Sequence, residues 1–233
     1  MFLQGFGYDP STNDYLLIHV FQSLDNPANY IEFFSLKENM WKEVDATSFT
    51  CKNNHNYCFD TQSGIALNDS IHWLASCPDT DIPIDVIIAF DLRKRNIFQI
   101  PLPPNFEADF SHICILGELL NIVKGYNFHS IEIWAMQKYK VQLSWSKTIV
   151  VSIDDIQMLY FSPICSTKSG DIVGDNGYDA LAKCDNKGKF KEFRRYFGGQ
   201  FGLHTTMLTY TETLLSLPCA NEQAAEGTRS IIS

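Results

Sequence analysis

Histidine and cysteine are the residue types in this chain that could bind a metal ion. The six histidines are His19, His55, His72, His112, His129 and His204. Zinc sites use such ligands in closely spaced pairs, and the nearest candidates are His55 with Cys58 and His72 with Cys77. Neither spacing matches a zinc site. We therefore predict no metal site and no cofactor, and interpret the histidines as core or surface residues.

Catalytic motifs are equally hard to find. Gly5 and Gly7 precede a polar turn rather than a helix N-terminus, so they do not form a phosphate-binding loop. The chain has no GxSxG motif and no carboxylate pair on a catalytic frame; we expect Asp154 and Asp155 to lie in a solvated loop. A propeller oxidase with a copper site of Tyr, Cys and His is the enzyme alternative, without supporting spacing. We predict that the protein is not an enzyme.

Composition restricts the partners and the compartment. The 233 residues include 18 basic and 27 acidic ones, a formal charge of -9, which disfavours binding to nucleic acid or anionic lipid. No apolar run reaches the roughly 18 residues of a membrane helix, and no signal peptide is recognisable. The seven cysteines are irregularly spaced and are predicted to be reduced thiols. We expect a protein of the cytoplasm, the nucleus or both.

The elements that must position any site are short strands, because apolar residues alternate along most of the chain. Strand-like runs, bounded by turn residues, occur at 15–21, 30–36, 70–76, 85–92, 130–136 and 145–151. They follow a repeating order of four strands, and the fourth strand is predicted to begin at or just after an aromatic residue. These aromatic residues are Trp41, Phe98, Trp145 and Phe190. Their spacing of about 50 residues is typical of a kelch-type propeller blade.

The repeat predicts an all-β fold, a kelch-like β-propeller of about four four-stranded blades that is incomplete. A further strand pair, 203–210 and 213–218, follows the fourth blade and is expected to form a C-terminal hairpin. The predicted domain covers 1–218, with its N-terminal part missing, and residues 219–233 are expected to be a disordered tail. A β-sandwich with similar hairpins is the alternative fold.

Seven stretches of the chain together resemble the plant F-box-associated domain of F-box and F-box/kelch-repeat proteins. They are GFGYDPSTNDY, FFSLKENMWKEV, GIALNDSIHWLA, VIIAFDLRKRNIFQIPLP, LGELLNIV, IEIWAMQKYKVQLSWSKTIVV and DALAKCDNKGKFKEF, which span about residues 4 to 196. The resemblance implies a noncatalytic protein-interaction module, the substrate-recognition part of a Skp–cullin–F-box ubiquitin ligase. It also implies a Skp-family adaptor as a partner, but only where an F-box lies upstream, and none precedes Met1 here. The alternatives are a small-molecule or sugar-binding propeller and a nonfunctional truncated F-box protein.

The loops of a propeller divide between two faces. Turns between first and second and between third and fourth strands are short here, whereas the loops of the opposite face are longer and unequal, for example 45–62 and 103–112. Because binding residues concentrate on loops held by a rigid scaffold, we expect the protein substrate to bind the long-loop face. The candidate anchors are aromatic residues with polar neighbours: Tyr57, Phe59, Phe106, Phe110, Tyr126, Phe128 and Tyr178.

Overall fold

The fold is built almost entirely from β-strands. The computed structural model describes residues 2–22, 29–44, 63–77, 84–108, 110–126, 129–156, 161–176 and 180–195. These residues form four antiparallel sheets of four strands each. The helical segments among them are a 3-10 turn, η1 (Gln142–Ser144), and a single helical turn, α1 (Ile153–Ile156). No helix in this part of the chain is long and apolar enough to cross a membrane. The predicted all-β class is confirmed.

Each sheet takes its strands in chain order. The first contains β1 (Phe2–Asp9), β2 (Asp14–Gln22), β3 (Asn29–Ser35) and β4 (Met40–Val44). The second contains β5 (Ile65–Leu67), β6 (Ser70–Cys77), β7 (Ile84–Asp91) and β8 (Asn96–Ile100). The third contains β9 (Phe110–Leu116), β10 (Leu119–Tyr126), β11 (Ser130–Met136) and β12 (Trp145–Ser152). The fourth contains β13 (Ser162–Ser166), β14 (Ile172–Asp175), β15 (Ala180–Cys184) and β16 (Phe190–Arg195).

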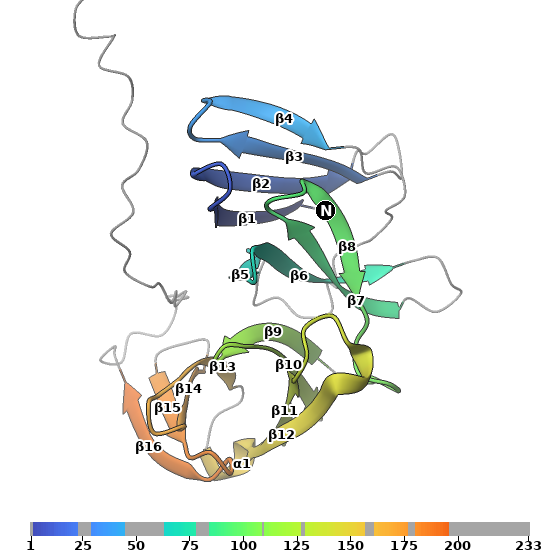
Figure 1. The fold of residues 1–233 in the computed structure, drawn as a ribbon. Helices are drawn as coiled ribbons and strands as arrows, with labels where there is room; N and C mark the ends of the chain where they lie inside the picture. The colour runs from blue at the N-terminus through green and yellow to red at the C-terminus, as the bar shows by residue number, and fades with distance from the viewer. Residues whose placement is uncertain are drawn as a thin grey trace, which may run out of the picture.

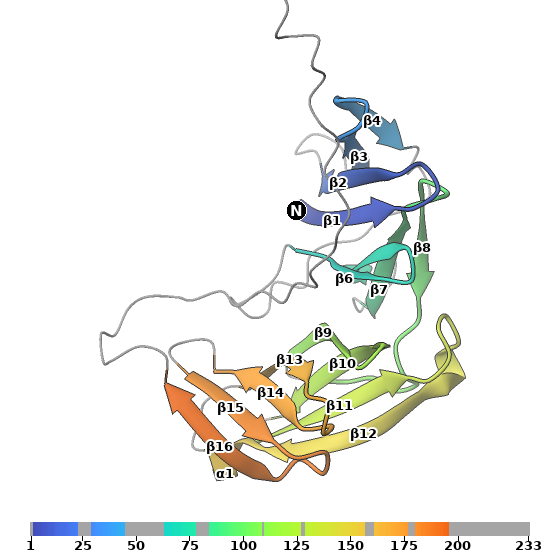
Figure 2. The ribbon, with the colours of Figure 1, turned by 60° about the vertical axis from the view of Figure 1, so that its left-hand side comes forward.

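The four sheets follow one another as the blades of an arc, which Figures 1 and 2 show from two directions. The first strands of successive sheets, β1, β5, β9 and β13, contact one another and form the inner side of the arc. A hydrophobic cluster fills each junction between neighbouring sheets. The described residues thus have the architecture predicted from the repeat, an incomplete β-propeller. The predicted C-terminal hairpin and tail lie outside the described residues.

Tight turns of the expected kind connect the strands. Asn68 and Asp69 join β5 to β6 with positive φ angles of 49° and 55°, the combination of a type I′ hairpin turn. Two local details differ from the sequence prediction. β8 begins at Asn96, two residues before Phe98, and the segment of Asp154 and Asp155 forms the helical turn α1 rather than a loop. In both cases, backbone hydrogen bonds form a regular element at residues where the alternation of apolar side chains does not indicate one.

The junction between the first two blades depends on glycine. A Cβ atom on Gly5 would lie 2.9 Å from Cζ2 of Trp73, and one on Gly7 would lie 2.8 Å from methyl groups of both Ile71 and Leu92. The indole Nε1 of Trp73 donates a 2.9 Å hydrogen bond to the main-chain oxygen of Gln4 in β1. The inner strand therefore packs with its backbone directly against β6, because it has no side chains at these positions.

His72 and Trp73 both pack between blades, although they lie at adjacent positions of one strand with opposite orientations. Strand alternation directs Trp73 toward the first sheet and His72 toward the third. His72 is fully buried; its Nδ1 donates to the oxygen of Ile65 at 3.2 Å and its Nε2 accepts from the Tyr139 hydroxyl at 2.7 Å. Burial lowers the pKa of His72 to about 4. The second sheet is thereby fixed on both sides.

Buried thiols and a second buried histidine lie in the junction of the third and fourth blades. Cys114 and Cys184 are free and buried, and burial raises their thiol pKa values to about 12 and about 11. His112 lies 3.1 Å from the Ser162 hydroxyl across the junction, and burial lowers its pKa to about 4. Cys114 and Cys184 are thus small core residues of this junction.

Replacement of the first glycine should loosen the first junction. We expect Gly5→Val to lower the free energy of unfolding by about 1–3 kcal/mol, because the added methyl groups overlap Ile71 and Trp73. Gln4→Val is the matched control, since its exposed side chain leaves the same strand on the opposite face. Urea denaturation of both variants measures the effect. Equal stabilities of the two variants would contradict the packing described.

The two buried histidines should make the protein sensitive to mild acid. Their pKa values are depressed in the folded state, so the stability of the neutral form is complete above about pH 6.5 and is lost as the pH falls toward 4. The loss should reach about 3 kcal/mol per histidine near pH 4. Urea midpoints measured from pH 7 to pH 4 should fall less steeply in His72→Gln than in the wild type. Parallel curves would show that His72 does not contribute.

Candidate functional site

The predicted anchors of the long-loop face are only partly visible. Tyr57, Phe59, Phe128 and Tyr178 lie outside the described residues. Phe110 is the first residue of β9 and Tyr126 the last of β10, and the pairing of Phe110 with Gly125 brings their backbones to one end of the third sheet. The side chains of Phe110 and Tyr126 are also outside the described part. Phe106 is the one anchor of the seven whose side chain the structure describes.

Phe106 holds the connection between the second and third blades against the sheet. Its half-buried ring packs on the hydrophobic cluster of that junction, and the buried ammonium group of Lys124 lies 4.9 Å from the ring centroid. Lys124 also lies 5.9 Å from the ring of Trp134. A cation over aromatic faces in a partly desolvated site stabilises the fold. Phe106 therefore has a structural role, and its role as an anchor stays a prediction.

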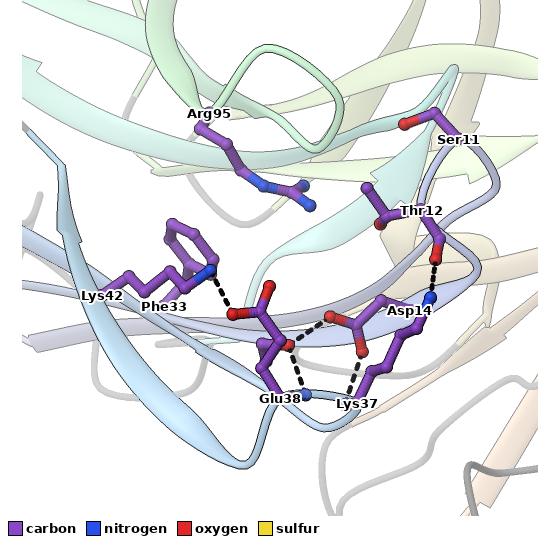
Figure 3. Close-up of a pocket in the computed structure, with 9 residues that line it drawn as sticks. Ser11, Thr12, Asp14, Phe33, Lys37, Glu38, Lys42 and Arg95 are labelled. Carbon is purple, nitrogen blue, oxygen red and sulfur yellow. Dashed lines mark hydrogen bonds and ion pairs between the residues drawn. The ribbon is translucent and has the colours of Figure 1, made fainter.

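A polar pocket opens on the other face, where the short turns of the first two sheets meet (Figure 3). Its cavity volume is about 340 Å³, within the range of ligand sites. The lining residues come from the β1–β2 turn, from the start of β2, from β3, β4 and the turn between them, and from the β7–β8 turn. They are Ser11, Thr12, Asp14, Phe33, Ser35, Lys37, Glu38, Lys42 and Arg95.

Asp9, at the end of β1, is the buried charge next to this pocket. Its side chain is fully buried, and each oxygen accepts two hydrogen bonds: Oδ1 from the amide and hydroxyl of Ser11, and Oδ2 from the Thr12 hydroxyl and from Nη2 of Arg95, the last at 2.7 Å. Burial raises the pKa of Asp9, but these hydrogen bonds and the charge of Arg95 outweigh it and lower the pKa to about 2. Asp9 is therefore ionised, and both of its oxygens already accept hydrogen bonds.

Asp14, at the start of β2, also has its hydrogen-bond partners within the fold. It is buried, accepts a hydrogen bond from the Ser35 hydroxyl, and accepts the amide of Lys37 at 2.8 Å. The Ser35 oxygen in turn accepts the amide of Glu38 at 3.0 Å. The carboxylate thus closes the β3–β4 turn onto the β1–β2 turn. A carboxylate held this way shapes the pocket and is a poor general base.

The cations of the pocket are less fully engaged. The guanidinium of Arg95 lies 5.1 Å from the ring centroid of Phe33, and its Nη1 is buried without a hydrogen-bond partner in the structure. The ammonium of Lys37 donates to the oxygen of Thr12 at 2.8 Å, and that of Lys42 pairs with Glu38 at 2.5 Å. The two buried carboxylates at the pocket, Asp9 and Asp14, therefore have hydrogen-bond partners, while Nη1 of Arg95 has none among the described residues.

Sequence analysis missed these pocket residues because it selected aromatic residues on long loops. Two signals were present: the DPST turn, in which an aspartate precedes hydroxyl residues that bond back to it, and the basic turn LRKR. Neither indicates that the two turns meet, since about 80 residues separate them. Among the described residues, no group of three His, Cys, Asp or Glu side chains is placed to hold a metal ion.

A second surface of the first sheet is aromatic. On the side of the sheet away from the second blade, the rings of Phe6 and Tyr15 stack with centroids 5.5 Å apart, and Trp41 contacts both His19 and Phe34. Phe6 and Trp41 are 51% and 44% exposed. Aromatic surfaces of this kind are enriched at protein interfaces.

Sequence comparison with known proteins identifies one family of β-propeller domains. The profile of the F-box associated beta propeller domain matches residues 1–203. The F-box protein CPR1 of Arabidopsis thaliana is 24% identical over 163 residues, which cover 63% of this chain and 40% of that protein. An F-box/kelch-repeat protein of the same plant is 24% identical over 150 residues, 63% of this chain and 39% of that protein. The chain thus spans about two-fifths of the length of these relatives.

The Asp9–Arg95 pair should be an important link between the first two blades. We expect Asp9→Asn to lower the free energy of unfolding by about 2–4 kcal/mol, because it leaves a largely buried guanidinium without its counter-charge. Asp69→Asn is the control. Asp69 of the β5–β6 turn pairs with Arg93 of the β7–β8 turn at 2.9 Å, but both side chains are about half exposed, so the loss should stay below about 1 kcal/mol. Similar losses in urea denaturation would contradict this assignment.

Proposed function

Since the chain belongs to the F-box-associated β-propeller domain family, we propose that it is a noncatalytic protein-interaction module that selects a protein for ubiquitination. In this proposal it acts as the substrate-recognition part of a Skp–cullin–F-box E3 ligase. The family match over residues 1–203 is the observation on which the proposal rests. The F-box names of the relatives support it. A Skp-family adaptor would bind an F-box of the protein rather than the blades.

The geometry supports a binding role in two ways. The blades interlock through buried side chains at each described junction, which gives loops and turns a rigid base. The oxygens of the two buried carboxylates at the pocket, Asp9 and Asp14, accept hydrogen bonds from groups of the fold itself. The proposal places the protein in the cytoplasm or the nucleus, and the free thiols of Cys114 and Cys184 suit a reducing compartment.

A reconstituted ligase tests the proposed function. The chain is fused behind the F-box of a relative, assembled with a Skp-family adaptor and a cullin, and used to capture and ubiquitinate proteins from a plant extract. We expect at least one captured protein to be ubiquitinated by the fusion and to bind the purified chain directly in calorimetry. The same F-box fused to an unrelated propeller is the control.

The two outcomes of this experiment are clear. Ubiquitination that requires the chain, together with a direct dissociation constant of about 10 µM or tighter, would establish substrate selection. Equal ubiquitination by the control fusion, or no direct binding by the purified chain, would reject it. Binding of a sugar or another small molecule in place of a protein would favour the alternative of a small-molecule-binding propeller.

A further inference from the structure

The pocket between the first two blades has donor capacity that the fold does not use. Nη2 of Arg95 donates to Asp9, whereas Nη1 is buried and has no hydrogen-bond partner among the described residues. A buried charged donor without a partner is unfavourable, by more than an ordinary unmade hydrogen bond. In Figure 3 the guanidinium of Arg95 lies between Phe33 and Thr12, and no hydrogen bond or ion pair joins it to the residues drawn there.

Two lysines border the same cavity. Among the described residues, the ammonium group of Lys37 has one hydrogen-bond acceptor, the oxygen of Thr12, for its three protons. Lys42 forms an exposed ion pair with Glu38, in which the two side chains are 39% and 49% exposed. Exposed pairs of this kind contribute little stability and rearrange at low cost. The two lysines can therefore turn toward a group that enters the cavity.

The donor groups of the lining favour an anion. The residues around the cavity include three cations, Arg95, Lys37 and Lys42, and two carboxylates, Asp14 and Glu38. Asp9 lies behind the lining and pairs with Arg95, so the formal charges of the site balance. Because Asp14 is buried in hydrogen bonds of the turns and Glu38 faces Lys42, the groups that can still take a partner are the donors of the three cations. Phe33 adds an apolar wall for the methylene groups that accompany a charged head group.

We propose that this pocket is an anion subsite, which receives an oxyanion on a side chain of the protein partner. Nη1 is closed off from solvent, so the partly exposed Arg95 side chain turns for Nη1 to donate the principal hydrogen bond, and Lys37 and Lys42 add charge at the rim. A carboxylate of Asp or Glu and a phosphate of a modified Ser share this chemistry. The inference deepens the proposed function, on which it rests, because it assigns partner chemistry to the short-turn face. It adds a second contact surface to the predicted one.

Titration of the full chain with short peptides tests the subsite. The probes are the capped pentapeptides Gly-Gly-Glu-Gly-Gly and Gly-Gly-pSer-Gly-Gly, with Gly-Gly-Gln-Gly-Gly as the neutral reference. Two-dimensional NMR that includes the arginine side-chain signals follows the pocket directly. We expect saturable shifts of the Arg95 side-chain signals with at least one anionic peptide, at a dissociation constant of about 1 mM, and none with the glutamine peptide. The tighter of the two anionic peptides identifies the head group.

Variants assign the effect to the pocket. Arg95→Gln should weaken anion binding about tenfold, because it removes a charge-assisted hydrogen bond, and Lys42→Gln about two- to threefold. Arg93→Gln is the matched control: it lies in the same turn but pairs with Asp69 and does not line the cavity. Because Arg95 also neutralises Asp9, Arg95→Gln is compared only if its backbone spectrum matches that of the wild type. If it does not match, the affinity of Lys42→Gln is the test of the subsite.

The peptide titration can reject the anion subsite without rejecting the proposed function, and the ligase experiment can reject the proposed function without rejecting the subsite. Absence of saturable shifts at about 10 mM of either anionic peptide, or equal binding by the wild type, Lys42→Gln and Arg95→Gln, overturns the anion subsite. Because the probes are peptides of defined sequence, this outcome does not depend on a captured substrate. A chain that binds the anionic peptides but selects no protein for ubiquitination keeps the subsite and rejects the proposed function.

Discussion

The contact between the inner strand β1 and the strand β6 is the constraint on which much of the described structure depends. Two glycines of β1 present bare backbone to Ile71, Trp73 and Leu92, and the Trp73 indole is anchored to the β1 main chain. A side chain at Gly5 would overlap Ile71 and Trp73, and one at Gly7 would force the methyl ends of Ile71 and Leu92 to shift. Because propeller blades are stabilised through their faces, this approach sets the relative position of the first two sheets.

The same contact creates the charged pocket. Leu92 lies at the base of the β7–β8 turn, so its packing against Gly7 brings that turn beside the turn that follows β1. Asp9 and Arg95 then meet at 2.7 Å across 86 positions of sequence. The pair is oriented by hydroxyl groups of Ser11 and Thr12, which leaves one side of the guanidinium facing the cavity. Packing of apolar groups therefore determines where the polar groups can act.

Titratable groups near the blade junctions are engaged inside the fold. Hydrogen bonds and the charge of Arg95 lower the pKa of Asp9 to about 2, and burial lowers the pKa values of His72 and His112 to about 4. These three groups therefore keep one protonation state near neutral pH. The chemistry of the turns and loops, rather than that of the strands, is what differs from blade to blade on this frame of the F-box-associated β-propeller family.

The amino-acid sequence alone determined the strands, their grouping into four blades and the family, because alternation, turn residues and aromatic spacing are local properties that the backbone follows directly. It also indicated that the turns between third and fourth strands are short. Only the tertiary structure decided that both His72 and Trp73 lie between blades, that Phe106 packs beneath Lys124, and that Arg95 meets Asp9. These contacts join residues of different blades, and their geometry depends on how sheets twist and stack, which no spacing along the chain records.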